Sequence, residues 1–224
     1  MRLLAIDTSS DACSVALQVG AETIDKHVVE PRAHTKILIP MLEELLRDAD
    51  VTLSELDAVV VGNGPGSFIG MRIGASVAQG ICHGAGLQIV PVSSLAAIAA
   101  EVIEEHGAEN ILVAQDARMH QVYLGRFHAD AARLPVAAED EKICGIGPLM
   151  VPGGNYAAAG AGWDKYPDLL ARNSKSIAVT TGVIYPRARY LLQLGASSKQ
   201  AGRAIAPAAL VPAYIRSKVA ERPA

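Results

Sequence analysis

The sequence has little that would suit a membrane-spanning or secreted protein. No uninterrupted apolar run approaches the roughly 20 residues that span a bilayer, and the opening MRLLAIDTSSDA turns polar before an apolar signal-peptide core could form. Only three cysteines occur, Cys13, Cys82 and Cys144, with no CxxC pair, so neither a disulfide framework nor a zinc cluster is indicated. We therefore expect a cytoplasmic protein with reduced thiols and no membrane contact.

The glycine-rich stretch GNGPGSFIGMRIG (62–74) lacks the residues that common phosphate-binding loops need. It contains no lysine, which excludes a P-loop. Ile69 stands where the dinucleotide fingerprint needs its third glycine, and Pro65 and Ile69 stand where a nucleophile elbow needs its two glycines. The stretch is therefore predicted to be a strand-to-helix turn with Ser67 as helix N-cap.

Histidine patterns typical of metal centres are also missing. The six histidines form neither HxxxH nor HExxH, so a metal site held by this chain is not expected. His34 stands alone before a predicted helix, where a single histidine is more typical of a capping or interface residue than of a ligand.

Charge is distributed unevenly along a chain of 224 residues whose net charge is only −3. Residues 1–110 hold 6 Lys/Arg against 15 Asp/Glu, and the remainder holds 14 against 8. The basic residues of the second half are dispersed and lack interleaved aromatic residues, which favours a solvated surface over a nucleic-acid site. Binding of nucleic acid or of an acidic partner by this half is the weaker alternative.

The first half has the pattern of a mixed sheet covered by helices. Residues 2–9, 13–19 and 23–30 read as three strands joined by hairpin turns. Periodic apolar residues then predict helices alternating with strands: helix 33–50, strand 56–63, helix 67–85, strand 87–92 and helix 93–107. The order βββαβαβα indicates an α/β protein.

The pattern restarts near residue 110. ILVAQDARMHQVYLGRF repeats the layout of LLAIDTSSDACSVALQV, and Asp7 and Asp116 correspond at an offset of 109. This self-similarity predicts two related domains, 1–107 and 108–224. The second is less regular, with a helix in PRARYLLQLGA and an irregular tail in PAALVPAYIRSKVAERPA.

Asp7, Thr8 and Ser9 form the candidate phosphate or nucleotide site. An aspartate at the end of the first strand, followed by small hydroxyl residues, places a carboxylate and backbone N–H groups at one mouth of the sheet. An ordinary Asp/Ser turn that satisfies its own backbone is an equal alternative.

Two helices form the candidate interface. The second helix carries a ridge of large side chains beside a row of small residues, so it is apolar nearly all round. Two arrangements would bury such a helix: it is packed between other elements of its own chain, or its glycine row receives a helix from another subunit. We favour the subunit interface. Its predicted residues are His34, Leu38, Met41, Leu42, Leu45, Ile69, Gly70, Ile73, Gly74, Val77 and Ala78.

Several blocks in order, including LLAIDTSSDACSVAL, GPGSFIGMRIG, PVSSLAAIA, DARMHQVY and ALVPAYIR, resemble the bacterial TsaB (YeaZ) family of tRNA threonylcarbamoyladenosine biosynthesis, which is related to TsaD and the glycoproteases. The resemblance covers nearly the whole chain. It implies two ribonuclease-H-like domains of the actin, Hsp70 and sugar-kinase (ASKHA) type, the second degenerate, with the N-terminal domain helices binding a partner.

The resemblance also implies an accessory role without catalytic residues or a cofactor of its own. The catalytic relative TsaD carries a paired-histidine metal motif that is absent here, where His34 stands alone. The chain is expected to pair with TsaD through its N-terminal helices and to work with the ATPase TsaE. The complex would transfer threonylcarbamoyl from its adenylate to the adenosine beside the anticodon, with ATP and a metal in the partner subunits. Homodimers are expected when TsaD is missing, and contact with tRNA mainly through the complex.

Two departures from the family pattern stand out. Ile69 and Met71 replace Thr and Leu in the glycine block, and the lost hydroxyl further disfavours phosphate chemistry. Gln115 replaces an aliphatic residue before Asp116. The rival hypothesis is a stand-alone enzyme, either a nucleotide hydrolase using Asp7 or a sialoglycoprotease-related metallopeptidase, and the missing histidine pair disfavours the second.

Overall fold

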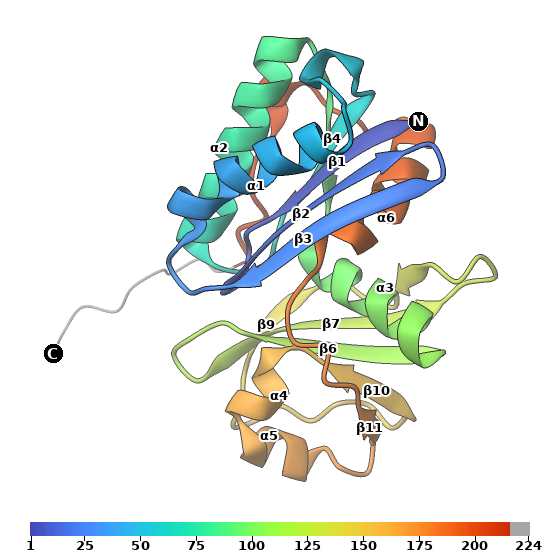
Figure 1. Ribbon diagram of the computed structural model, residues 1–224. Helices are drawn as coiled ribbons and strands as arrows, with labels where there is room; N and C mark the ends of the chain where they lie inside the picture. Colours follow the sequence, from blue (N-terminus) through green and yellow to red (C-terminus); the bar gives the residue numbers. More distant parts are fainter. Residues whose placement is uncertain (216–224) are drawn as a thin grey trace, which may run out of the picture.

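A computed structural model describes residues 1–215, and residues 216–224 lie outside the described part. The chain forms two sheets, one above the other, with helices on their faces and between them (Figure 1). The first part of the chain contains β1 (Arg2–Asp7), β2 (Ala12–Val19), β3 (Glu22–Val29), α1 (His34–Asp48), a 3₁₀ turn (Leu53–Glu55), β4 (Ala58–Gly62), α2 (Phe68–Ala85), β5 (Ile89–Val92) and α3 (Ser94–His106).

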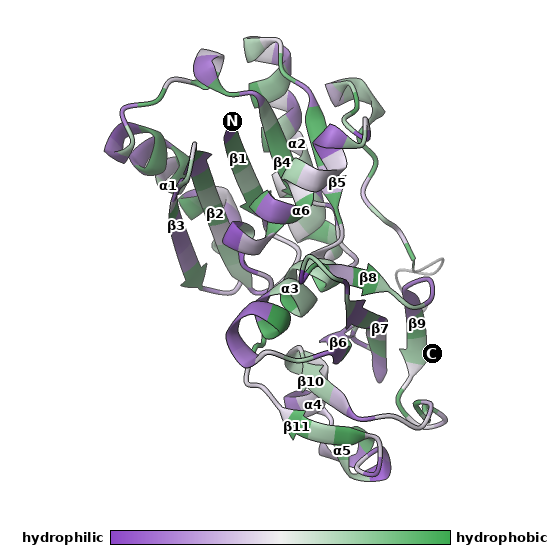
Figure 2. Cartoon of the chain, turned by 90° about the vertical axis from the view of Figure 1, so that its right-hand side faces the viewer, coloured by the Kyte–Doolittle hydropathy of each residue, from purple (hydrophilic) through white to green (hydrophobic). Residues whose placement is uncertain are grey.

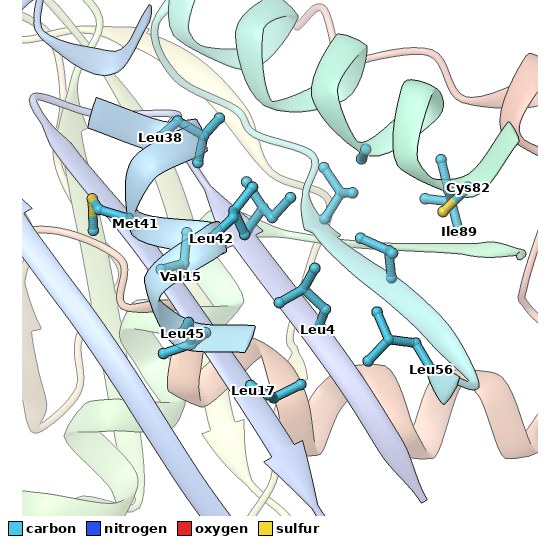
Figure 3. Packing of buried hydrophobic residues seen from close by; sticks show 14 of the residues in the cluster. Leu4, Val15, Leu17, Leu38, Met41, Leu42, Leu45, Leu56, Cys82 and Ile89 are labelled. Carbon is cyan, nitrogen blue, oxygen red and sulfur yellow. The ribbon is translucent and has the colours of Figure 1, made fainter. Parts of the chain in front are cut away.

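The first sheet has the strand order β3-β2-β1-β4-β5. β1 and β2 pair antiparallel, as do β2 and β3, whereas β4 joins β1 in parallel and β5 joins β4 in parallel. β1 is buried on both faces because successive residues alternate between them. Leu4 and Ile6 meet α1 and α2 in one cluster, which Figure 3 shows from close by, whereas Leu3 and Ala5 meet helices on the opposite face.

The opposite face is covered by a helix from the far end of the chain. α6 (Ala188–Gln200) packs across β1, β2, β4 and β5, with Leu191 and α3 residues in the same cluster. Gly195 permits this contact, because a Cβ at that position would collide with the side chain of Val60. The chain therefore returns to its first sheet after building the second.

The second sheet starts with another antiparallel hairpin and is extended by parallel strands. Its path is β11-β10-β6-β7-β8, with β9 also paired to β7. α3 covers one face, and two short helices cover the other. The elements are β6 (Asn110–Asp116), β7 (Gln121–Ala129), β8 (Pro135–Ala137), β9 (Lys142–Gly145), β10 (Tyr156–Ala159), α4 (Ala161–Lys165), α5 (Pro167–Arg172) and β11 (Ile177–Thr180).

The predicted fold class is confirmed: this is an α/β protein with two mixed sheets in two ribonuclease-H-like units. Central strands of the first sheet are hydrophobic and edge strand β3 is hydrophilic (Figure 2), as suits an edge that faces water. The division at 107/108 remains a prediction, with α6 returning across it. Of the predicted tail, a 3₁₀ turn (Pro207–Ala209) and an irregular stretch are described; the rest lies outside the described residues. No helix within residues 1–215 is long and apolar enough to cross a membrane.

Candidate functional site

A cleft with a volume of about 650 Å³ opens between the two sheets. The two hairpin turns that the sequence predicts to be equivalent, one after Asp7 and one after Asp116, both line it. The loop before α2, the first turn of α2, the start of α3, α4, residues 184–186 before α6 and the C-terminal segment also line it. The size is that of a small-molecule site, so the chemistry of each turn decides what the cleft could bind.

Both oxygens of the Asp7 carboxylate accept hydrogen bonds from the chain itself. Its Oδ1 atom accepts bonds of 2.8 Å from the Ser9 N–H and the Ser9 hydroxyl, and its Oδ2 atom accepts one of 2.7 Å from the Ser94 hydroxyl. Burial raises the pKa of Asp7, although the bonds from Ser94 and Ser9 act in the opposite direction. The side chain is 1% exposed and holds the turn to α3.

The start of α2 lies directly on the same turn. Thr8 donates a 2.7 Å hydrogen bond from Oγ1 to the Gly70 carbonyl oxygen, and the Ser67 N–H donates to the Ser9 carbonyl oxygen at 2.6 Å. A Cβ at Gly70 would collide with the Thr8 carbonyl oxygen, and one at Gly66 with the Ser9 carbonyl oxygen. Backbone of α2 and of the loop before it thus lies directly against Thr8 and Ser9, which leaves no room on this side of the turn for a bound metal–phosphate group. The assignment of Asp7, Thr8 and Ser9 to a phosphate or nucleotide site stays a prediction.

The row of small residues on α2 does not face outward as predicted. Gly70, Gly74 and Ala78 are predicted to receive a partner helix, but all three are buried within the chain. A Cβ at Gly74 would lie 2.5 Å from Thr8 Oγ1, so the row receives the β1–β2 turn instead. The sequence left two alternatives open for this face of α2, and the structure has the first of them: the face is packed within its own chain and does not receive another subunit. The N-cap prediction is confirmed, since Ser67 Oγ accepts a 3.2 Å hydrogen bond from the Gly70 N–H.

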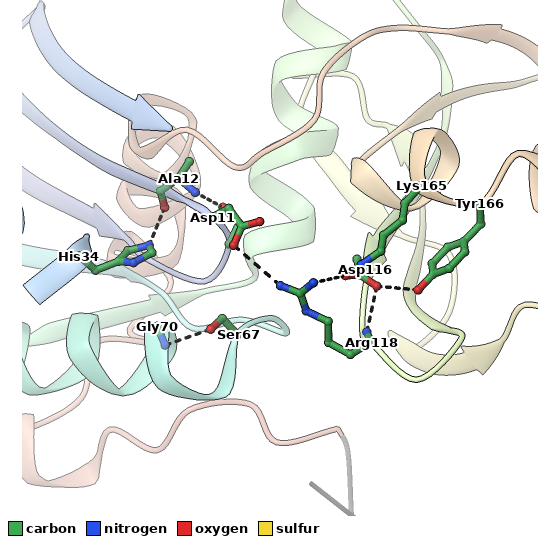
Figure 4. Close-up of polar contacts among 10 residues, drawn as sticks. Asp11, Ala12, His34, Ser67, Gly70, Asp116, Arg118, Lys165 and Tyr166 are labelled. Carbon is green, nitrogen blue, oxygen red and sulfur yellow. Dashed lines mark hydrogen bonds and ion pairs between the residues drawn. The ribbon is translucent and has the colours of Figure 1, made fainter. Parts of the chain in front are cut away.

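The second turn carries a paired acid rather than a free one (Figure 4). Asp116 accepts hydrogen bonds from Lys165 Nζ at 2.5 Å, Tyr166 Oη at 2.8 Å and the Arg118 N–H at 2.9 Å. Partial burial acts to raise its pKa, but these bonds outweigh it and hold the pKa below its ordinary value. The Arg118 guanidinium also lies 4.0 Å from Asp11 of the first turn, so an ion pair crosses the cleft.

The backbone of the second turn is unusual. Arg118, Met119 and His120 are three consecutive residues with φ values of 62°, 53° and 54°. Left-handed backbone in residues other than glycine costs about 1 kcal/mol or more each. Strain of this kind gathers at functional sites, and here it places Arg118 opposite Asp11. Within the described part of the chain, no group of three or more His, Cys, Asp or Glu side chains could hold a metal ion.

The predicted interface residues of α1 lie under the helix. Leu38, Met41, Leu42 and Leu45 are buried against the first sheet (Figure 3). His34 is also buried, and its Nε2 atom lies 3.2 Å from the Ala12 carbonyl oxygen (Figure 4). These side chains hold α1 in place and do not reach the surface of the single chain.

The ridge of α2 is the part of the predicted interface that faces outward. Ile69 is 69% exposed, and Ile73 and Val77 are half-buried at the edge of the core cluster. On α1, Ile39 is exposed and Ile37 half-buried. Large aliphatic side chains therefore remain at the surface of both helices.

Two features are missed by the sequence analysis. Ser94 donates a hydrogen bond to Asp7, whereas its neighbour Ser93 is the N-cap of α3. Exposed Phe68 and Tyr214 lie together at the cleft mouth. The serine pair PVSS was the only signal for the first feature, and no sequence signal brings Tyr214 to Phe68, because 146 positions separate them.

Sequence comparison places the chain among proteins of tRNA modification. Residues 28–223 match the family model of TsaD, the tRNA N6-adenosine threonylcarbamoyltransferase. The chain is 33% identical to the tRNA threonylcarbamoyladenosine biosynthesis protein TsaB of Haemophilus influenzae, over 98% of this chain and 95% of that protein. It is 34% identical to TsaB of Escherichia coli, over 98% and 96%.

Solved structures agree with this similarity. YeaZ from Pseudomonas aeruginosa superposes with a TM-score of 0.88 at 34% identity, covering 95% of this chain and 99% of that one. A further Pseudomonas aeruginosa structure, described as similar to the peptidase YeaZ, gives a TM-score of 0.89 at 34% identity, over 96% and 99%. The shared fold spans both sheets.

Proposed function

The chain belongs to the TsaB (YeaZ) family, and we propose that it acts in tRNA threonylcarbamoyladenosine biosynthesis as a non-catalytic accessory subunit. It pairs with TsaD and works with the ATPase TsaE in transferring threonylcarbamoyl from its adenylate to the adenosine beside the anticodon. The chemistry, with its ATP and metal, belongs to the partner subunits. Contact with tRNA is mainly through the assembled complex.

One observation carries the non-catalytic assignment: the hydrogen bonds that close off Asp7. A carboxylate that acts on a ligand must face that ligand. Asp7 is instead buried, and both of its carboxylate oxygens accept hydrogen bonds from Ser9 and Ser94. The α2 backbone then occupies the neighbouring space. The turn therefore has a structural role: its hydrogen bonds link the end of β1 to the starts of α2 and α3.

The outward ridge of α2 supplies the partner surface. Exposed Ile69, half-buried Ile73 and Val77 of α2, and exposed Ile39 of α1 leave aliphatic area at the surface, and burying such area drives association. Leu38, Met41, Leu42, Leu45 and His34 support this surface from beneath. The same face forms homodimers when TsaD is missing.

A pull-down with TsaD, read with and without TsaE and ATP, tests the pairing. Ile73→Asp and Val77→Asp would bury an unpaired charge in the interface, so we expect both variants to lose TsaD while remaining folded. Val179→Asp, which places the same charge on exposed strand β11, is the control and should pair as the wild type does. If Ile73→Asp still pairs normally, the ridge is not the interface.

Reconstituted modification of tRNA tests the accessory role. Asp7→Asn preserves the shape and most of the hydrogen bonds of the side chain, so it should leave modification by the complex at the wild-type level. Calorimetry of the isolated chain with ATP and Mg²⁺ should show no binding. Binding that Asp7→Asn weakens would favour the nucleotide-hydrolase alternative instead.

A further inference from the structure

A small aromatic patch lies at the mouth of the cleft and shares Ile69 with the ridge of α2. We name it the Tyr214 patch; it consists of Phe68, Ile69, Arg72, Val211 and Tyr214. All except Arg72 are large apolar or aromatic side chains that are exposed. Phe68 is one of only two phenylalanines in a chain that is 4% aromatic. Exposed aromatic groups gathered in one place mark an interaction site more often than scattered ones do.

The rings of the patch are held in a fixed arrangement by Arg72. Its guanidinium carbon lies 3.2 Å from the centre of the Phe68 ring and 4.8 Å from that of the Tyr214 ring. The two ring centres are 6.0 Å apart, and Arg72 Nη1 donates a 2.8 Å hydrogen bond to the Phe68 carbonyl oxygen. Because the rings are pre-ordered, a partner that binds them loses little conformational entropy.

The C-terminal segment that carries Tyr214 is anchored to the body of the protein on both sides of the cleft. Asn63 Nδ2 donates a 3.1 Å hydrogen bond to the Val211 carbonyl oxygen, and the Ala213 N–H donates to the Asn63 carbonyl oxygen at 3.0 Å. Leu210 is buried in the core under α1 and α2, whereas Ile215 packs against the cluster between α3 and the second sheet. Tyr214 therefore projects from a segment fixed at both ends.

The patch is continuous with the surface assigned to TsaD. Phe68 and Ile69 form the first turn of α2, and Ile73 and Val77 follow Ile69 one and two turns later on the same ridge. Tyr, Phe and Arg are typical of the residues that contribute most to protein–protein binding.

The charge pattern favours a protein over RNA as the occupant. Arg72 is the only charged member of the patch, and its guanidinium is occupied by two rings and a carbonyl oxygen. At the cleft mouth, Arg118 and Lys165 are paired with Asp116. A phosphate-binding surface would need several free cations instead.

We propose that the Tyr214 patch is a binding site for TsaD, extending the interface from the helices onto the C-terminal segment. This inference rests on the proposed function. The site takes a protein surface that offers an apolar pocket or a planar side chain to the two rings.

Affinity for TsaD, measured by calorimetry, tests the proposal. Tyr214→Ala and Phe68→Ala should each weaken binding by about 30-fold, the effect of removing a central aromatic contact. Tyr214→Phe keeps the ring and should bind as the wild type does. Val179→Ala, which removes an exposed apolar side chain from β11, should also have no effect. A photo-crosslinking amino acid at Val211 in the otherwise unchanged chain should join it to TsaD, which gives a readout that does not depend on a destabilised variant.

The outcomes separate this inference from the function on which it rests. If the alanine variants and the crosslinker leave TsaD untouched while Ile73→Asp abolishes pairing, the patch is outside the interface and the proposed function stands. If Tyr214→Ala weakens only self-association, or only salt-sensitive tRNA binding, the patch serves a second copy or RNA and the proposal is wrong. If the wild-type chain does not bind TsaD at all, the proposed function itself fails.

Discussion

Replacement of Gly70 by alanine should destabilise the protein, although alanine is the better helix former. The new Cβ would collide with the Thr8 carbonyl oxygen, a backbone atom of the β1–β2 turn that cannot rotate away as a side chain could. Overpacking costs about 1–3 kcal/mol, and the displaced hydrogen bond from Thr8 costs about 1 kcal/mol more. Improved helix propensity offsets about 1 kcal/mol. The expected net loss in free energy of unfolding is about 2 kcal/mol.

Gly80 on the same helix provides a matched control. No atom lies within 4 Å of a Cβ built there, so Gly80→Ala should stabilise the protein by about 0.5–1 kcal/mol. Thermal and urea unfolding, followed by circular dichroism, would measure both. Gly70→Ala should lower the midpoint temperature by about 4–8 °C for a chain of this size. If Gly70→Ala proves as stable as Gly80→Ala, the close packing of α2 on the turn is not what requires glycine.

Three further predictions concern stability. Ser94→Ala leaves a buried oxygen of Asp7 without its donor, so urea unfolding should show a loss of about 1–3 kcal/mol; an unchanged midpoint would mean that the bond contributes nothing. Burial raises the pKa of Glu101 to about 7 against the opposing effect of Arg187, so the folded state binds this proton more tightly than the unfolded state does. The resulting stabilisation is present below the ordinary glutamate pKa and is lost as the pH rises toward 7. Glu101→Gln should therefore flatten the fall in stability across that range and be the more stable protein at pH 8, by about 1 kcal/mol after allowing for partial exposure; a slope that stays unchanged would contradict this. Asp50, just after α1, has a left-handed backbone with φ of 51°. Because glycine adopts this conformation without strain, Asp50→Gly should raise the free energy of unfolding by about 1 kcal/mol; calorimetric unfolding that shows a less stable variant would refute this.

Local periodicity predicts much of the fold because it reports which side of an element is buried. The stripe of α1 and the N-cap of α2 depend on neighbours close in sequence, and the structure has both of them. The same periodicity cannot say what covers a buried face. The small residues of α2 indicate a close approach of backbone, but whether that backbone comes from a partner or from the β1–β2 turn is a tertiary question.

The candidate site is harder to predict than the fold for the same reason. The composition of DTSS suits a ligand-binding turn as well as a turn whose side chains bond only to the protein itself. The hydrogen bond that decides between them comes from Ser94, on a helix that is distant in sequence. Likewise, the helix in PRARYLLQLGA is predicted correctly, but nothing in its pattern shows that it packs on the first sheet rather than the second. Contacts between distant segments decide both cases.

The return of α6 to the first sheet has a consequence for how the protein is made. Domains generally fold as they emerge from the ribosome, N-terminal first. Here the first sheet cannot complete its core in that order, because Leu3, Ala5 and Val60 lack the cover of α6 until this helix, which follows every strand of the second sheet along the chain, has emerged. During synthesis the nascent chain carries an apolar sheet face that chaperones can recognise, and a ribosome that stalls before α6 leaves that face uncovered.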